Sequence, residues 1–254
     1  MRFNFDRETN TRLDADQLAW LEKILIRNTH ANVTLIGSSI QVIPDYYRVS
    51  ETFAYKNKRL LFDLLNKYKK SNVLILSGDV HYAQFYSSKC KGFVGGYKLW
   101  EFTSSGLSHT QADFQIGATP EMELLTHPFW TESDIKILPN FGQVDIDLLT
   151  DNSIDLHLTA FGIHGEILLQ TTLNTKQMQF NEKGLQQNAK MCQITHEKHQ
   201  LILHLAQFMQ HLVGFKNPMT LMYLQVLPLG MVVLPITFGV YIFRKLCQRM
   251  LKIC

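Results

Sequence analysis

Asp79 and His81 are the residues whose types and spacing best suit metal or proton chemistry in this sequence. They follow an apolar run at residues 73–76, and such a run is typical of a strand buried on both faces of a sheet. Gly78 favours a close turn of the backbone after that strand. With Val80 between them, the carboxylate and the imidazole can point to the same side and bind a hard or borderline divalent cation. A structural aspartate beside a surface histidine would give the same four-residue sequence, Gly78 to His81.

A second apolar and β-branched run, at residues 32–37, also ends at a glycine. Residues 56–70, between the two runs, place apolar side chains at helical spacing. The order strand, helix, strand predicts a right-handed βαβ unit with a parallel sheet. An amphipathic helix is also expected at residues 15–28, with Asp14 as its N-cap and Gln17 completing a capping box.

Polar residues follow both predicted strands, where ligand sites of α/β sheets collect. Ser38, Ser39 and Gln41 lie in the loop after the first strand and can line a phosphate pocket. Capping of the turn is the alternative role for each serine. His109, in a later polar loop, either approaches the same site or is solvated.

Five further segments show the pattern of β-strands, with turns at Asp151-Asn152 and at residues 162–165. The expected fold class is therefore α/β, a layered sheet with an antiparallel portion. The predicted strands are residues 84–88, 97–103, 141–149, 153–161 and 166–173.

The C-terminal part of the chain has the features of a membrane anchor. Residues 219–243 hold no charged side chain and exceed the roughly 20 residues that cross a bilayer. Four cations in the eleven residues that follow predict a cytoplasmic tail and a luminal or extracellular body, by the positive-inside rule. A tail anchor inserted after translation would instead leave the body in the cytosol. These four cations exceed the net charge of +3, so the rest of the chain shows no nucleic-acid surface.

The sequence resembles the PhoD-like alkaline phosphatases, a branch of the calcineurin-like metallophosphoesterases. The similarity covers residues 5–173 and runs through five segments in the order of that family. The segments are LDADQLAWLEKIL, TLIGSSIQVIP, LILSGDVHYAQF, YKLWEFTSSGLSHT and NFGQVDID.

The resemblance implies a hydrolase of phosphate esters with a centre of two divalent or trivalent metal ions, for which Fe, Ca, Mn and Zn are candidates. Asp79 and His81 would be metal ligands, and His81 also the catalytic residue. Ser39, Gln41 and His109 would bind the substrate. Two cations about 3.5 to 4 Å apart can hold a hydroxide and clamp a phosphate during in-line displacement.

One departure from the family pattern concerns the first half of the fold, whose Asp and Asn-His motifs do not occur in this sequence. We expect a C-terminal part of a longer phosphatase; the alternative is a catalytically inactive, membrane-bound binding or scaffold relative that has lost the metal centre. The expected parts are a partial phosphatase domain at 1–173, a linker at 174–195, an amphipathic helix at 196–215, the membrane helix at 219–243 and the basic tail at 244–254. The sequence does not indicate an oligomeric state.

Overall fold

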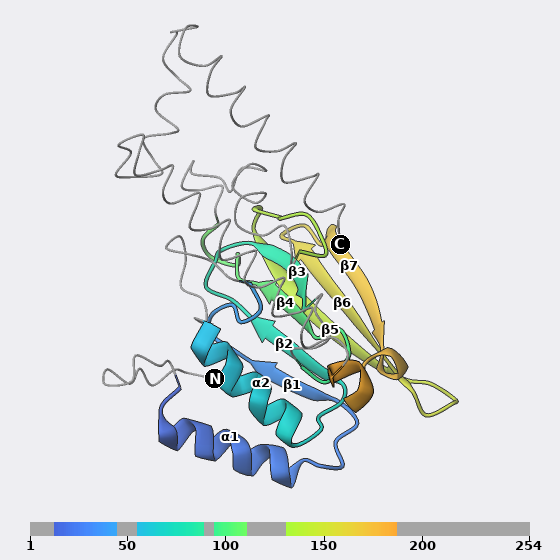
Figure 1. The fold of residues 1–254 in the computed structure, drawn as a ribbon. Helices are drawn as coiled ribbons and strands as arrows, with labels where there is room; N and C mark the ends of the chain where they lie inside the picture. The colour runs from blue at the N-terminus through green and yellow to red at the C-terminus, as the bar shows by residue number, and fades with distance from the viewer. Residues whose placement is uncertain (1–12, 45–54, 89–93, 111–130, 187–254) are drawn as a thin grey trace, which may run out of the picture. The chain divides into compact units, whose positions relative to one another are not determined.

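The computed structural model describes residues 13–44, 55–88, 94–110 and 131–186 (Figure 1). The chain divides into two compact units, Met1–Lys198 and His199–Cys254, and every described residue belongs to the first. The amphipathic helix predicted at residues 196–215, the membrane helix at 219–243 and the basic tail at 244–254 lie outside these residues. Within the described ranges, no helix is long and apolar enough to cross a membrane.

The first sheet contains four strands, in the order β1-β2-β4-β3 (Figure 1). Strands β1 (Thr34–Gly37), β2 (Val73–Ser77) and β4 (Trp100–Ser104) run parallel, and β3 (Ala83–Ser87) is antiparallel to β4. The register pairs the last residue of β1 with Leu76 and the last residue of β2 with Thr103. The carboxyl ends of the three parallel strands therefore meet at one edge, which confirms the predicted parallel βαβ unit.

The two predicted helices are confirmed as α1 (Ala15–Arg27) and α2 (Tyr55–Lys67). The Asp14 side chain accepts a hydrogen bond from the Gln17 amide, 2.8 Å away, and so caps α1. The helices lie side by side, since Glu22 of α1 accepts a hydrogen bond from Tyr68, just beyond α2, at 2.5 Å (Figure 1). Leu25 of α1, 2% exposed, and Leu65 of α2, fully buried, belong to the same hydrophobic core, where each such side chain contributes about 2 kcal/mol.

The second sheet is a three-stranded antiparallel meander of β5 (Asn140–Leu148), β6 (Ile154–Gly162) and β7 (Ile167–Asn174). Its central strand contributes the fully buried Leu156 and Leu158 to the same core as the first sheet. All five antiparallel segments predicted from the sequence are strands, although β4 is parallel to β2. They divide between two sheets, whereas the sequence predicts one layered sheet with an antiparallel portion.

Residues 174–186 pack against the first sheet, and the rest of the predicted linker at 174–195 lies outside the described residues. A short 3-10 helix, η2 (Thr175–Gln177), follows β7, and Met178 after it is 2% exposed. The Met178 carbonyl accepts a hydrogen bond from the Asn72 amide at 2.8 Å, and the Phe180 amide donates to Ser71 Oγ at 2.8 Å. The segment is polar in composition, but the buried Met178 side chain holds it against the sheet.

Candidate functional site

Asp79 and His81 lie in the turn that follows β2, and both have left-handed backbones, with φ of 76° and 62°. This conformation costs a non-glycine residue roughly 1–2 kcal/mol. Two such residues in one short turn need support from the surroundings, and strained turns of this kind cluster at functional sites. Val80 between them is 5% exposed and anchors the turn, while Asp79 is exposed and His81 half-buried. The His81 amide donates to Ser105 Oγ at 2.9 Å.

The backbone freedom expected of Gly78 is not used at that residue. A Cβ placed on Gly78 would lie 3.4 Å from the Ser105 Cβ and 3.8 Å from the Ser39 carbonyl oxygen, which are ordinary contacts, and its φ is not in the left-handed region. These two distances show instead that the loops after β1, β2 and β4 meet around Gly78. The shared edge predicted for Ser39 and Asp79 is thus present.

The loop after β4 brings His109 to the same edge. The ring centroids of His81 and His109 are 6.2 Å apart, with the ring planes inclined by 37°. His109 is exposed, and its Nδ1 lies 3.1 Å from Ser108 Oγ. Asn140, at the start of β5, fixes this loop because its Oδ1 accepts hydrogen bonds from Ser104 Oγ at 2.9 Å and the Gly106 amide at 3.4 Å.

Gln41 lies beneath the site and is completely buried. Its Nε2 donates to Thr103 Oγ1 at 3.1 Å, and its Oε1 accepts from the Tyr82 hydroxyl at 3.4 Å. Thr103 Oγ1 is also 2.7 Å from Ser77 Oγ. Both ends of the Gln41 amide are therefore used inside the protein, which differs from the predicted direct contact with substrate, whereas Ser39 is exposed.

Glu101, the second residue of β4, is a buried carboxylate that the sequence prediction missed. It is completely buried and accepts hydrogen bonds from the amides of Val42 at 2.9 Å and Ile43 at 2.6 Å. Burial raises the pKa of Glu101, opposed by the hydrogen bonds from Ser77 and the two amides and by the Lys58 charge. The signal in the sequence is one acid inside the otherwise apolar strand segment LWEF.

Asp79 and His81 are the candidate metal-binding side chains at this edge of the sheet. Asp79 offers a carboxylate and His81 an imidazole, a donor pair that suits borderline and hard cations. Catalytic metal sites commonly use three protein ligands, and among the described residues no group of three or more His, Cys, Asp or Glu side chains could hold a metal ion. These residues therefore do not complete a two-metal centre by themselves.

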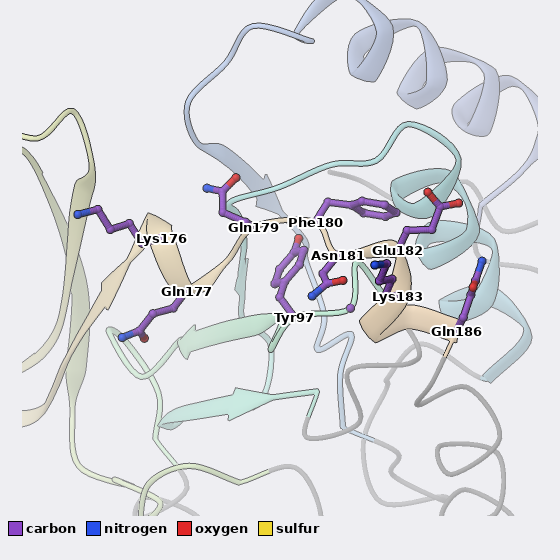
Figure 2. A pocket seen from close by; sticks show the side chains of 10 residues that line it. Tyr97, Lys176, Gln177, Gln179, Phe180, Asn181, Glu182, Lys183 and Gln186 are labelled. Atoms are coloured by element: carbon purple, nitrogen blue, oxygen red, sulfur yellow. The ribbon is translucent and has the colours of Figure 1, made fainter.

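A polar hollow of about 770 Å³ lies at the opposite edge of the first sheet, between Tyr97 and the segment after β7 (Figure 2). Lys176 and Lys183 carry its positive charges. The Tyr97 hydroxyl donates to the Lys70 carbonyl at 3.2 Å, and burial raises the pKa of Tyr97. None of the residues predicted for the site lines this hollow.

No family model matches the sequence, and no curated protein matches it. A solved structure described as "Structure of PhoD" is similar over 76% of this chain and 42% of its own, with 16% identity and a TM-score of 0.40. The chain thus spans less than half the length of that structure. The fold and the site define a mixed α/β protein with a polar site at the carboxyl edge of its sheet.

Proposed function

We propose that the chain is part of a metal-dependent phosphoric ester hydrolase of the PhoD-like kind, with Asp79 and His81 among its metal ligands. The observation that carries the proposal is the turn after β2, in which both residues hold left-handed backbones beside His109 and the Ser39 loop. The sequence motifs at residues 74–85 and 97–110 support the same assignment. In this proposal the strained backbone directs the Asp79 and His81 side chains toward the metal while Val80 between them stays buried.

The roles follow from the positions of the side chains. Asp79 and His81 bind the metal, with His81 as the catalytic residue, while Ser39 and His109 contact the phosphate ester from the neighbouring loops. A bound metal would polarise the phosphoryl group and supply a hydroxide at neutral pH. The remaining ligands come from residues other than those described, in this chain or in a longer form of it. Gln41 supports the site through its hydrogen bonds to Thr103 and Tyr82.

The test is hydrolysis of p-nitrophenyl phosphate and bis-p-nitrophenyl phosphate by the longest native form of the protein, supplied in turn with Fe, Ca, Mn and Zn. We expect Asp79→Ala and His81→Ala each to abolish activity. Asp134→Ala and His164→Ala are matched controls, because both residues are exposed and lie in other segments, and they should retain activity. Unchanged activity in both site variants would remove Asp79 and His81 from the ligand set. A wild type inactive with every metal would favour the non-enzymatic binding or scaffold protein.

We also propose that residues 219–243 anchor the protein in a membrane as a single span, with a cytoplasmic tail and a luminal or extracellular body. The support is the apolar length of this segment and the four cations after it. Protease treatment of sealed membranes should leave the body protected and the tail accessible. Digestion of the body would instead indicate a tail anchor with a cytosolic domain.

A further inference from the structure

The loop at residues 38–44 carries Ser39 to the candidate site and is unusually buried for a loop. Ile40, Gln41, Val42 and Ile43 are at most 4% exposed. Buried backbone amides and carbonyls need hydrogen-bond partners inside the protein, since water does not reach them. The loop begins with an ordinary sheet contact, in which the Ser38 amide donates to the Leu76 carbonyl at 2.8 Å.

One carboxylate accepts hydrogen bonds from two further backbone amides of this loop. Glu101 Oε1 accepts from the Val42 amide at 2.9 Å, and Oε2 accepts from the Ile43 amide at 2.6 Å. A carboxylate has acceptors on both oxygens, whereas a glutamine would turn an NH₂ group toward one of the two amides. Glu101 itself is fixed in the sheet, paired with Ile75 of β2 and Tyr86 of β3.

One ammonium group donates to two backbone carbonyls at the end of the same loop. Lys58 of α2 is 5% exposed, and its Nζ donates to the Ile43 carbonyl at 2.6 Å and the Pro44 carbonyl at 3.3 Å. The amides of residues 42 and 43 and the carbonyls of residues 43 and 44 are thus bound by opposite charges from two different elements. The two charges come from different elements and hold the backbone of this loop between them, and the Lys58 charge favours the ionised form of Glu101.

We propose that Glu101 and Lys58 are positioning residues, which hold loop 38–44 so that Ser39 meets the substrate beside Asp79. This inference rests on the proposed function. The link to the site is geometric, because the Ser39 carbonyl lies 3.8 Å from the point where a Cβ on Gly78 would stand. A shift of the loop would therefore displace Ser39 relative to Asp79, whereas the turn that carries Asp79 and His81 has its own support from Ser105.

The first experiment measures hydrogen exchange of the full chain and needs no activity. In Glu101→Gln, amides in the peptide that covers residues 38–44 should exchange about tenfold faster, because a charge-assisted hydrogen bond is lost. Glu132→Gln is the matched control, since Glu132 also accepts a side-chain hydrogen bond, from Ser87, and pairs with Lys98. Ser87 pairs with Trp100, whose side chain is on the face of β4 opposite to that of Glu101. Equal exchange of this peptide in the wild type and Glu101→Gln would overturn the proposal.

The second experiment separates positioning from folding by steady-state hydrolysis of bis-p-nitrophenyl phosphate. Glu101→Gln should raise KM about tenfold and leave kcat within about twofold, since the loop serves substrate binding and not the metal turn. A lower kcat with unchanged KM would mean that only the active fraction fell, and would overturn the positioning role. A wild type without hydrolysis contradicts the proposed function alone, and hydrogen exchange then decides whether the pair holds the loop.

Variants at Lys58 keep the test decisive if Glu101→Gln folds poorly. Lys58→Met is similar in length and removes the donor to both carbonyls, and Glu101→Gln with Lys58→Met removes both charges and leaves neither one unpaired. Both variants should show the faster exchange and the higher KM. A double variant with the exchange and KM of the wild type would show that the loop holds its position without the pair.

Discussion

Asp79 and His81 both hold left-handed backbones, with φ of 76° and 62°, although only Val80 separates them. Aspartate and histidine tolerate this region better than most residues, but the conformation still has a cost for each. The burial of the Val80 side chain and the hydrogen bond from the His81 amide to Ser105 Oγ offset that cost. The conformation of the turn is therefore set by its surroundings, and the side chains at its two strained positions remain accessible.

Replacement of Asp79 separates the conformation of the turn from its chemistry. Asparagine also tolerates the left-handed region, so Asp79→Asn should change the free energy of unfolding by less than about 0.5 kcal/mol. Asp79→Val places a β-branched residue at positive φ and should cost about 1–2 kcal/mol. Urea denaturation of both variants checks the difference, and titration with Mn²⁺ should show weaker binding in each. Equal stability of the two variants would contradict the left-handed conformation.

Gly106 is a position where a side chain does not fit. A Cβ there would stand 2.2 Å from Asn140 Nδ2, and this side chain makes hydrogen bonds to Ser104, Gly106 and Leu138. Gly106→Ala should therefore displace Asn140 and lower the free energy of unfolding by about 2 kcal/mol. Gly78→Ala is the control, because its nearest contact of 3.4 Å is ordinary, and it should cost less than about 1 kcal/mol. Thermal denaturation of both variants measures this difference in stability, and equal loss in the two would contradict the close contact at Gly106.

The elements of this fold could be predicted from the sequence because their signals are local. Helical spacing placed α1 and α2, and apolar runs that end at a glycine placed β1 and β2. The meeting of Ser39 and Asp79 followed from strand direction, since parallel strands end at one edge. The position of His109 did not, because residues 97–103 were expected in the antiparallel portion and β4 is parallel to β2. Site residues that follow strands were therefore accessible to prediction before any contact was known.

The remaining features depend on contacts between distant segments, which local patterns do not encode. The predicted turns at Asp151-Asn152 and residues 162–165 join β5, β6 and β7, but no local pattern shows that this meander forms a sheet separate from β3 and β4. Glu101 gains its role only when loop 38–44 folds over β4. Gln41 is polar by type, but within that loop its side chain is buried against Thr103 and Tyr82. Its residue type and its position after β1 led to its prediction as a substrate contact.

Glu101 should make the stability of the protein depend on pH. Burial raises its pKa above the ordinary value of 4.5, although Lys58 and the hydrogen-bond donors around it oppose the rise. The folded state then keeps this proton to a higher pH than the unfolded chain, so the free energy of unfolding falls as pH rises from about 4.5 to the raised pKa and levels off above it. Urea denaturation between about pH 4 and pH 8 measures this. Glu101→Gln should remove this component of the decline, and an unchanged pH profile in the variant would contradict it.

Met178 should contribute to the stability of the body, although it lies in a polar segment. It is 2% exposed, and Met178→Ala should lower the free energy of unfolding by about 2–4 kcal/mol. The neighbouring Gln177 is exposed, so Gln177→Ala should change stability by less than about 0.5 kcal/mol. Chemical denaturation of the two variants tests whether this segment belongs to the folded body. Equal stability of the two would indicate a linker after β7.

Ser39 and Gln41 should differ in what their loss affects, although both were predicted to bind substrate. Ser39 is exposed, so Ser39→Ala should leave the free energy of unfolding within about 0.5 kcal/mol and raise KM for phosphate esters. Gln41→Leu removes the buried partner of Thr103 and Tyr82, and should cost about 1–3 kcal/mol because their polar groups lose a hydrogen bond. Denaturation and steady-state kinetics on the same preparations separate the two effects. A destabilised Ser39→Ala beside an unaffected Gln41→Leu would reverse the positions that the structure gives these residues.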